Sequence, residues 1–293
     1  MTTEPLSSPM ELRHLRAFLA VAEHSHFTRA AAALRVSQSS LSRTVATLER
    51  CVGQRLIDRN QHVTRLSDAG EHFLPYAHRA VAAADEAFAA VRDKRFPLRI
   101  GFTWNALGED TGPLVNRFEA EHPGATVQLQ RCDDDPLAGL ADGRSHLAIL
   151  RTVPNNGLGF LRFLEERRII ALPRSHPLAD RDHVTLEETK NDPLVVNIIS
   201  GSGTPLLWGA VDDSRPLMEV NNIDEWLEAI AAGRGIGAST TSTAKFHPHP
   251  RVVYLPLEGA EPVNVIIAWE SLDSHPHTAH FIATAKKWRH VRG

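Results

Sequence analysis

Apolar residues in the first part of the chain recur with helical spacing and predict three short helices. Leucines fall three or four positions apart on one face of a first helix near 12–22. Thr28 suits the N-terminal cap of a second helix over 30–34, because its side-chain oxygen can accept a hydrogen bond from a free backbone N–H group. Ser37 takes the same position before a third helix, which we expect to end near Arg50.

The third helix has two unlike sides. Leu41, Val45 and Leu48 cluster within ~60° when residues are placed 100° apart, and they predict a core-facing side. The opposite side carries Ser39, Arg43, Ala46 and Arg50, flanked by Ser42 and Thr47, with Gln38 in the first turn. Serine and glutamine can hydrogen-bond base edges, arginine can bind guanine with two hydrogen bonds, and free N–H groups at a helix start suit phosphate. The pattern therefore favours DNA recognition, with an ordinary solvated face as the alternative.

A strand–turn–strand pattern follows the third helix. Two short runs, Arg55–Arg59 and Val63–Leu66, enclose the polar segment Asn60–His62. Basic residues on such a hairpin, directly after a DNA-recognition helix, predict a wing.

Ser67 then suits the cap of a long helix that we expect to reach about Asp93. Its apolar positions step alternately by four and three, which is typical of a heptad seam. The seam consists of Phe73, Ala77, Ala80, Ala84, Ala87 and Val91, broadened by Leu74, Val81 and Phe88. At ~1.5 Å per residue the helix is roughly 40 Å long, more than one small domain covers. We interpret it as a dimerisation helix, and packing within the chain is the alternative.

After residue 97 the pattern changes to strands alternating with helices, which predicts an α/β fold with a parallel sheet and helices on both faces. The expected strands are Leu98–Phe102, Thr126–Leu129, Leu147–Leu150, Arg168–Leu172, Leu194–Asn197, Leu217–Val220, Val252–Leu255 and Val263–Trp269. The expected helices are Leu114–His122, Leu137–Ala141, Leu186–Thr189, Pro205–Val211, Ile223–Ala232 and His277–His290.

The elements suggest three domains. We expect a winged helix-turn-helix over 10–66, a linker and dimerisation helix over 67–94, and a regulatory domain over 97–293. The regulatory domain divides into a first subdomain, about 97–167 with 264–293, and a second subdomain, about 168–263, because the last strand and helix return to the first unit.

Charge is distributed unevenly along the chain of 293 residues. Residues 1–66 hold nine arginines and five acidic residues, a net charge of +4. Since the whole chain has a net charge of −3, the remaining residues carry a net charge of −7. An arginine-rich head on an acidic body is typical of a polyanion-binding module joined to another domain. With 42% apolar and 23% charged residues, bulk disorder is excluded, and no segment predicts a membrane span or a signal peptide. We expect a cytoplasmic protein.

Weaker signals point to other chemistry. His247-Pro-His249 and His275-Pro-His277, with His280, have a short spacing that could bind zinc or nickel, but solvated loop histidines are favoured. Cys51 and Cys132 lie in different predicted domains, which disfavours a redox pair. The sequence lacks a Gly-x-Ser-x-Gly elbow, a P-loop and an HExxH motif, so an enzyme is a minor alternative. A free-standing solute-binding protein is contradicted by the basic head.

Several stretches form a specific set. Near the N-terminus they are Met10-Glu-Leu-Arg-His-Leu-Arg-Ala-Phe-Leu-Ala-Val-Ala-Glu, Phe27-Thr-Arg-Ala-Ala, Val36-Ser-Gln-Ser-Ser-Leu-Ser-Arg, Leu48-Glu and Leu66-Ser-Asp-Ala-Gly. Later they are Asp142-Gly-Arg-Ser-His-Leu-Ala-Ile-Leu-Arg151, Leu172-Pro-Arg-Ser-His-Pro-Leu-Ala179 and Ile230-Ala-Ala-Gly-Arg-Gly-Ile-Gly237. Through these residues, between 10 and about 285, the chain resembles the LysR-type transcriptional regulators.

The resemblance implies a winged helix-turn-helix regulator with a dimerising linker helix and a regulatory domain similar to periplasmic binding proteins. It implies a dimer or tetramer on double-stranded operator DNA, a small-molecule effector, RNA polymerase as a partner of an activator, and no cofactor. The DNA-binding residues expected by the family's motif and its flanks are Thr28, Arg29, Ser37, Gln38, Ser39, Ser42 and Arg43, with Arg59, His62 and Arg65 in the wing. A redox-responsive or ligand-independent member of the same family is the alternative.

The resemblance also places the effector in a cleft between the two subdomains. The residues expected there are Thr103, Trp104, Asn105, Cys132, Asp133, Ile198, Ser200, Ser202, Thr204, Asn222 and Ile223. Hydroxyl groups and helix starts suit a carboxylate, whereas Asp133 and its acidic neighbours would repel one. Trp104 offers a stacking wall or is a core aromatic. The ligand class therefore stays open.

The chain departs from the family pattern in four places. Cys51-Val-Gly-Gln-Arg-Leu-Ile stands where the family usually has leucine-glycine-x-x-leucine-phenylalanine. Ser39-Ser40 stands where proline is common, which puts the operator sequence in doubt. His146 replaces the usual aspartate before the Leu-Ala-Ile strand. The segment 238–243 is polar where the family is apolar, which implies an altered pocket wall, a more polar ligand or a degenerate effector site.

Overall fold

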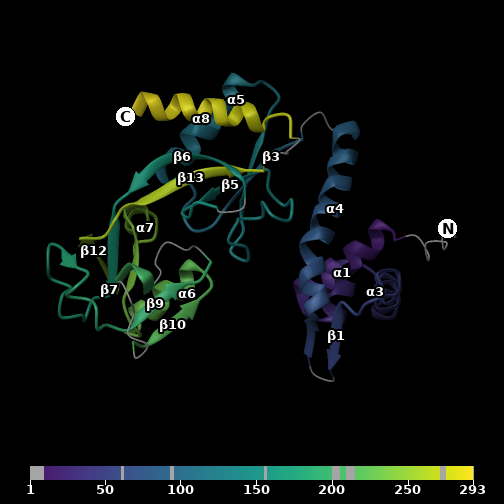
Figure 1. The fold of residues 1–293 in the computed structure, drawn as a ribbon, viewed down its shortest axis with the longest axis horizontal. Coiled ribbons are helices and arrows are strands. Elements are labelled where there is room, and N and C mark those ends of the chain that lie inside the picture. The colour runs from purple at the N-terminus through teal and green to yellow at the C-terminus, as the bar shows by residue number, and fades with distance from the viewer. Residues whose placement is uncertain are drawn as a thin grey trace. The chain divides into compact units, whose positions relative to one another are not determined.

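The computed structural model describes residues 10–60, 63–92, 96–154, 157–199, 205–208, 215–270 and 275–292, and forms two compact units. The first unit is Met1–Phe96 with Ala141–Arg144, and the second is Pro97–Leu140 with Ser145–Gly293 (Figure 1). Among the described residues, no helix combines the length and the apolar character needed to span a bilayer.

The first unit begins with three helices, as predicted: α1 (Leu12–His24), α2 (Phe27–Ala33) and α3 (Gln38–Val52). They share a core in which Phe18, Leu41 and Val45 are essentially inaccessible to solvent. The N-terminal cap of α2 is not Thr28, as predicted, but His26, whose Nδ1 accepts a hydrogen bond from the backbone N–H of Thr28 at 3.1 Å. The ring nitrogen takes the role expected of a hydroxyl, so the helix begins earlier in the chain.

A two-stranded antiparallel sheet follows α3. It consists of β1 (Ile57–Asn60) and β2 (Val63–Leu66). Glu49 of α3 fixes the start of this hairpin, because its carboxylate accepts hydrogen bonds from the backbone N–H groups of Leu56 at 3.0 Å and Ile57 at 3.1 Å. The predicted strand–turn–strand element is therefore present.

The long helix α4 (Asp68–Arg92) is also present, and Ser67 caps it by accepting a hydrogen bond from the N–H of Gly70 at 3.1 Å. Its first part belongs to the core of the helical head. The Phe73 ring lies edge-on to Phe18, with centroids 5.5 Å apart, and Ala77 is 1% exposed. The head therefore extends past the wing into α4.

The second unit contains a five-stranded sheet in the order β4-β3-β5-β13-β6. The strands are β3 (Leu98–Phe102), β4 (Val127–Arg131), β5 (Leu147–Leu150), β6 (Gly159–Glu166) and β13 (Val263–Trp269). The sheet is mixed and not purely parallel as predicted, because β13 runs antiparallel to both β5 and β6. Strand β6 escaped the sequence analysis because it is an edge strand with alternating exposed positions.

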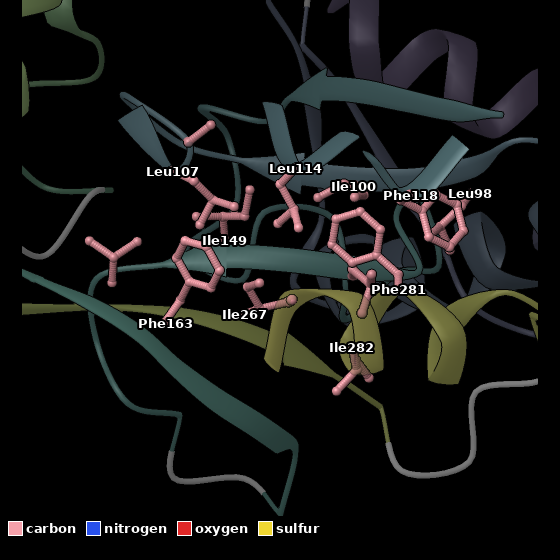
Figure 2. Packing of buried hydrophobic residues seen from close by; sticks show 14 of the residues in the cluster. Leu98, Ile100, Leu107, Leu114, Phe118, Ile149, Phe163, Ile267, Phe281 and Ile282 are labelled. Carbon is pink, nitrogen blue, oxygen red and sulfur yellow. The ribbon is translucent and has the colours of Figure 1, made fainter. Parts of the chain in front are cut away.

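One face of this sheet is covered by α5 (Thr111–Glu121) and α8 (Thr278–Arg292). Figure 2 shows Phe118 of α5 and Phe281 of α8 among these core residues, and their ring centroids are 5.2 Å apart. The opposite face packs on residues 137–140, which form turns and not the predicted helix. Helices on both faces were therefore a wrong expectation for this sheet.

A four-stranded sheet in the order β11-β7-β12-β8 forms the second subdomain. The strands are β7 (Arg168–Pro173), β8 (Val184–Thr185), β11 (Gly237–Thr240) and β12 (Val252–Glu258). A parallel pair, β9 (Leu194–Asn197) and β10 (Leu217–Val220), lies next to it through a bridge between Leu194 and Ile236. Helix α6 (Ile223–Ala231) packs on this subdomain through the buried Trp226.

Two local predictions in the second subdomain need correction, and two elements of its segment 237–246 were not predicted. The expected helix over 186–189 is a turn. In place of the expected helix over 205–211, the structure has a 3-10 turn at Pro205–Trp208. Residues 209–211 lie outside the described residues. The polar segment after Gly237 forms β11 and a short helix, α7 (Thr241–Phe246), and is mostly buried.

Candidate functional site

Helix α3 presents a polar face that lacks free carboxylates. Its core side, Leu41, Val45 and Leu48, is at most 1% exposed, which fixes the rotation of the helix about its axis. The opposite side leaves Gln38, Ser39, Arg43 and Arg50 exposed and Ser42 half-buried. Glu49, the acidic residue of α3, is occupied by the wing backbone. The exposed face is therefore built from hydrogen-bond donors and two cations.

The helix start and the arginines of this face are held by short-range hydrogen bonds. Ser37 is the cap, as predicted, and its Oγ accepts from the N–H of Ser40 at 3.2 Å. Arg43 donates from Nε to the carbonyl of Ser39 at 3.4 Å, a long contact, and Arg50 donates to the hydroxyl of Thr47 at 2.9 Å. Both guanidinium groups keep further N–H donors for an outside acceptor.

Other predicted DNA-binding residues lie around this face. Thr28 and Arg29 are exposed on α2, and Arg65 is exposed on β2. Arg59 lies in β1 by its backbone, while His62 lies outside the described residues. Two arginines of α1 that the sequence did not single out, Arg13 and Arg16, line a groove of about 700 Å³ with Arg43 and Glu11; Arg13 is paired with Glu11 and Arg16 with Asp85. Their signal was a basic first helix beside the recognition helix.

In the second unit, the turn after β3 is joined to α7 by buried hydrogen bonds. Trp104 donates from Nε1 to the hydroxyl of Thr243 at 2.8 Å. Asn105 donates from Nδ2 to the hydroxyls of Ser242 at 3.1 Å and of Thr243 at 2.9 Å. Ser239 shares a further hydrogen bond with Thr243 at 2.7 Å. These contacts join the first subdomain to the second at the predicted effector cleft.

His247 completes this network. Its Nε2 lies 2.6 Å from Oδ1 of Asn105, and its backbone carbonyl accepts a hydrogen bond from the hydroxyl of Tyr254 at 2.6 Å. Burial lowers the pKa of His247; Arg131 adds to this shift, while Asp224 opposes it. Burial also raises the pKa of Tyr254 to about 12. A neutral imidazole and a neutral phenol therefore stand at this position near pH 7.

The wall beside the network is acidic. Asp133 pairs with Arg131, with Oδ2 and Nε 2.5 Å apart. Burial raises the pKa of the Asp133 carboxyl, the Arg131 guanidinium opposes that shift, and Asp134 and Asp224 add to it. The negative charges here disfavour a bound anion.

The remaining effector residues fall into different environments. Trp104 is a core aromatic, 5% exposed and edge-on to Trp226 at 5.5 Å, so it is not a free stacking wall. Cys132 is buried among apolar side chains, and Ile223, the first residue of α6, belongs to the core on which that helix packs. Thr103 is buried, whereas Ile198 is 49% exposed.

Asn222 has a local structural role, because its Oδ1 caps α6 by accepting from the N–H of Glu225 at 2.9 Å. Ser200, Ser202 and Thr204 lie outside the described residues. Of the predicted set, Trp104 and Asn105 thus meet the α7 network, which includes Ser242, Thr243 and His247. The polar segment 238–243 was noticed in the sequence, but its pairing with Asn105 depends on long-range folding.

The histidines do not form a metal site in the described part of the chain, where no group of three or more potential ligands has a suitable arrangement. Five of them lie as neighbouring rings at the start of α8 and beside it. The closest pairs are His146 with His275 at 4.2 Å and His122 with His280 at 4.9 Å between centroids. These rings pack as aromatic side chains and not as a chelate.

Two family models match the chain. "Bacterial regulatory helix-turn-helix protein, lysR family" matches residues 12–71, and "LysR substrate binding domain" matches residues 92–289. The first match covers α1 to the start of α4, and the second covers all described strands of the second unit.

Similar proteins agree with this assignment. The Hca operon transcriptional activator HcaR of Escherichia coli K12 is 29% identical over 95% of this chain and 98% of its own length. The regulator ShiR of Corynebacterium glutamicum strain R is 30% identical over 85% of this chain and 88% of its own length. The crystal structure of CbnR, a LysR family transcriptional regulator, has the same fold, with a TM-score of 0.66 at 23% identity over 95% of this chain and 99% of CbnR.

The relatives are named as regulators and not as enzymes, in agreement with the lack of catalytic motifs in the sequence. The three short helices and the hairpin lie within the range of the first model, and the strands of the second unit lie within the range of the second model. The chain belongs to the LysR family of DNA-binding transcriptional regulators, with a helix-turn-helix head and an effector-binding domain.

Proposed function

We propose that this regulator binds a specific operator through α3, with the wing on the DNA backbone. The observation that carries the proposal is the exposed face of α3, where Gln38, Ser39 and Arg43 stand clear of the core and Glu49 is turned to the wing. Side chains of these types hydrogen-bond base edges in the major groove. A similar structure, full-length CbnR, is solved with its target DNA.

The basic groove between α1 and α3 supports phosphate contacts beside the recognition helix. Arg13, Arg16 and Arg43 line it, and Arg65 adds a cation on β2. Phosphate contacts of this kind position a protein on the duplex, whereas base contacts select the sequence. We assign Arg29, Arg59, His62 and Arg65 to the positioning group.

The regulatory step is a shift between two arrangements of the second unit. The buried bonds from Asn105 to Ser242, Thr243 and His247 hold the subdomains together without ligand. An effector whose polar groups replace these hydrogen bonds stabilises a second arrangement of the subdomains. The size of the shift depends on how much more tightly the effector binds the second arrangement than the first. The acidic wall of Asp133 and Asp224 favours a neutral or cationic polar ligand in this cleft.

Assembly through α4 rests on the apolar side chains that the head core leaves outside. Tyr76 is 51% and Phe88 is 62% exposed, and Ala80 and Ala87 are exposed on the same stretch. We propose that this face pairs two chains and that the dimers form a tetramer. Function as an activator would add RNA polymerase as a partner, and the site of action is the cytoplasm.

A ligand-independent regulator is the second candidate. The hydroxyls of Ser239, Ser242 and Thr243 are all engaged in hydrogen bonds within the chain. A cleft that satisfies its own polar groups has less to offer an outside ligand. A redox-responsive regulator is a further alternative: OxyR proteins are among the similar structures, and the two cysteines, Cys51 and Cys132, belong to different units.

DNA binding by the purified full-length protein tests the proposal. Labelled duplex from the DNA upstream of its own gene is titrated against random-sequence competitor between about 50 and 200 mM salt, and a randomised pool is selected in parallel. We expect competitor-resistant binding that weakens steeply with salt, and an enriched sequence. Failure of any sequence to be enriched would overturn site-specific recognition.

A further inference from the structure

Arg50 is a cation near the centre of the exposed face of α3, outside the residues assigned so far to base and phosphate contacts. It lies in the last turn of the helix and is exposed. With residues placed 100° apart, Arg50 and Arg43 point in directions only ~20° apart, and both lie opposite the core side of α3. The two guanidinium groups therefore belong to one stripe of the helix.

The spacing of the two arginines sets what each can reach on a duplex. Seven residues at ~1.5 Å per residue separate Arg43 from Arg50 by roughly 10 Å along the helix axis. A recognition helix reads base edges with its N-terminal residues. A cation in the last turn therefore lies past the bases and beside the sugar–phosphate backbone.

Thr47 holds the side chain of Arg50. The Thr47 hydroxyl donates to the backbone carbonyl of Arg43 at 3.0 Å and accepts from Nη2 of Arg50 at 2.9 Å. One hydroxyl can make both bonds at once, because it has one donor and two lone pairs. An arginine side chain loses much rotamer freedom when it is fixed, and the bond to Thr47 removes part of that freedom before DNA binds.

The charge of Arg50 is directed to the outside of the molecule. Among the described residues, the hydrogen bond to Thr47 is its polar contact, and no carboxylate pairs with it. The α3 helix ends at Gly53, whose φ is 75° and whose N–H bonds to the carbonyl of Glu49 at 2.9 Å. The last carbonyls of a helix carry partial negative charge and repel a phosphate, and a cation in the last turn offsets that repulsion.

We propose that Arg50, positioned by Thr47, binds a DNA phosphate about three nucleotides beyond the base that Arg43 contacts, since the phosphates of one strand follow at ~3.4 Å along the duplex axis. Arg50 makes the contact, and Thr47 is a positioning residue that acts through it. Contacts at two separate points of one helix fix its register and tilt in the groove. The inference rests on the proposed operator binding through α3 and extends it to a pair of residues outside the base-reading set.

Arg50→Gln tests the contact, because it removes the charge and keeps a good helix former. Affinity of the full-length protein is measured by fluorescence anisotropy on the enriched operator and on random duplex between about 50 and 200 mM salt. We expect a loss of about tenfold on both duplexes and a salt slope shallower by about 1, because one charged phosphate contact is removed. Arg234→Gln, a change at an exposed arginine of the second unit, is the matched control and should bind as the parent does.

Two changes at Thr47 test its positioning role. Thr47→Val keeps the shape and deletes the hydroxyl, so it should weaken binding of both duplexes, by less than Arg50→Gln does. Thr47→Ser keeps the hydroxyl and should restore the parent affinity. Combined with Arg50→Gln, Thr47→Val should cause no further loss, because Thr47 acts through Arg50. A further loss in the double variant would remove Thr47 as a positioning residue.

Ethylation of single operator phosphates locates the contact. The guanine contacted by Arg43 is the one whose replacement no longer matters in Arg43→Ala. In the parent protein, an ethyl group about three nucleotides from that guanine should block binding, given the helix rise and the phosphate spacing. Arg50→Gln should lose its sensitivity at that phosphate alone.

Unchanged affinity and salt slope in Arg50→Gln would overturn the proposal and leave Arg50 as a solvated cation at a helix end. A loss confined to the operator would overturn the phosphate assignment, because phosphate contacts carry no sequence information. Selection of an operator by the parent protein is measured first, so a failure of the proposed function is recognised by itself. The salt slope on random duplex then still tests Arg50.

Discussion

At the scale of single residues, the exposed face of α3 owes its chemistry to where one carboxylate goes. The carboxylate of Glu49 accepts hydrogen bonds from two backbone N–H groups of the hairpin, so this negative charge is directed toward the wing and away from the exposed face of α3. Arg43 and Arg50 are thus left as the charged groups on that face of α3. The same carboxylate ties the recognition helix to the wing.

Arg43→Ala should weaken specific operator binding by ~1–3 kcal/mol and bring it closer to binding of random DNA, because arginine reads guanine through two hydrogen bonds. Fluorescence anisotropy with operator and random duplexes gives both affinities. Arg181→Ala is the control, since Arg181 is exposed in the second unit. Equal losses on operator and random DNA would mean that Arg43 contacts phosphate alone.

Two half-buried histidines make the second unit sensitive to acid. Burial lowers the pKa of His277, as do the neighbouring His280 and His122, and burial and Arg131 lower that of His247 against the opposing Asp224. Since the folded pKa lies below the unfolded one, the unfolded chain takes up protons first as pH falls below ~6.5. The free energy of unfolding therefore keeps this contribution at pH 7.5 and loses it as the pH falls through ~6.5.

Urea unfolding at pH 7.5 and pH 5.5 measures this decline as a lower midpoint at the acidic pH. The double variant His247→Asn and His277→Phe should show a smaller difference between the two pH values. His183→Asn, a change at an exposed histidine, should keep the full difference. An unchanged pH response in the double variant would show that other groups carry the acid sensitivity.

At the scale of elements, the sequence specifies the helical head better than the second unit. The apolar spacing and Ser37 place α3 correctly, since both act over neighbouring residues of one helix. Strand β6 and helix α7 were not predicted. β6 is an edge strand, and α7 is a short helix whose polar side chains are buried by hydrogen bonds to Asn105. Such pairings depend on residues distant in sequence, which local patterns do not encode.

The same contrast holds for the candidate sites. The exposed side of α3 follows from the spacing of Leu41, Val45 and Leu48, so the exposure of Gln38, Ser39 and Arg43 is confirmed, while their contact with DNA stays a prediction. The sequence shows Arg151 only as the last residue of a motif. No local pattern indicates that an arginine after an apolar strand is buried, with two side-chain nitrogens that lack a hydrogen-bond partner. Long-range burial is the information that the sequence pattern lacks.

The junction between the wing and α4 depends on a glycine. A Cβ atom on Gly70 would lie 2.0 Å from the carbonyl oxygen of Leu56, so the first turn of α4 can approach the backbone only without a side chain. Gly70→Ala should lower the stability of the head by ~1–3 kcal/mol through overpacking, although alanine favours helix elsewhere.

Thermal unfolding followed by circular dichroism measures that loss. Gly112→Ala is the matched control, because Gly112 lies in α5 and a Cβ there would meet nothing within 4 Å. A Gly70→Ala protein as stable as the parent would contradict the close approach of Leu56 to α4.

At the scale of the whole molecule, the apolar seam of α4 has an early part and a later part with different surroundings. Phe73 and Ala77, which the seam included, pack within the head, and Phe88 lies exposed further along the helix. The described side chains do not include that of Val91. A disruption of pairing that leaves the head intact must therefore target the later part of α4.

Phe88→Glu should convert the proposed dimers or tetramers to monomers, because it places charge in an apolar seam. Light scattering gives the mass, and circular dichroism should show the head still folded. Asp85→Asn does not place charge in the seam and should leave the mass unchanged. An unchanged mass in Phe88→Glu would remove α4 as the pairing surface.

The shared core of the head and α4 limits how such regulators can be cut and recombined. A chimera joined at Leu66 would separate Phe18 from Phe73 and leave an aromatic ring facing water or a foreign helix. A junction after Val81 keeps every described apolar partner of the head on one side of the splice. This head should therefore be transplanted together with the first half of its own linker.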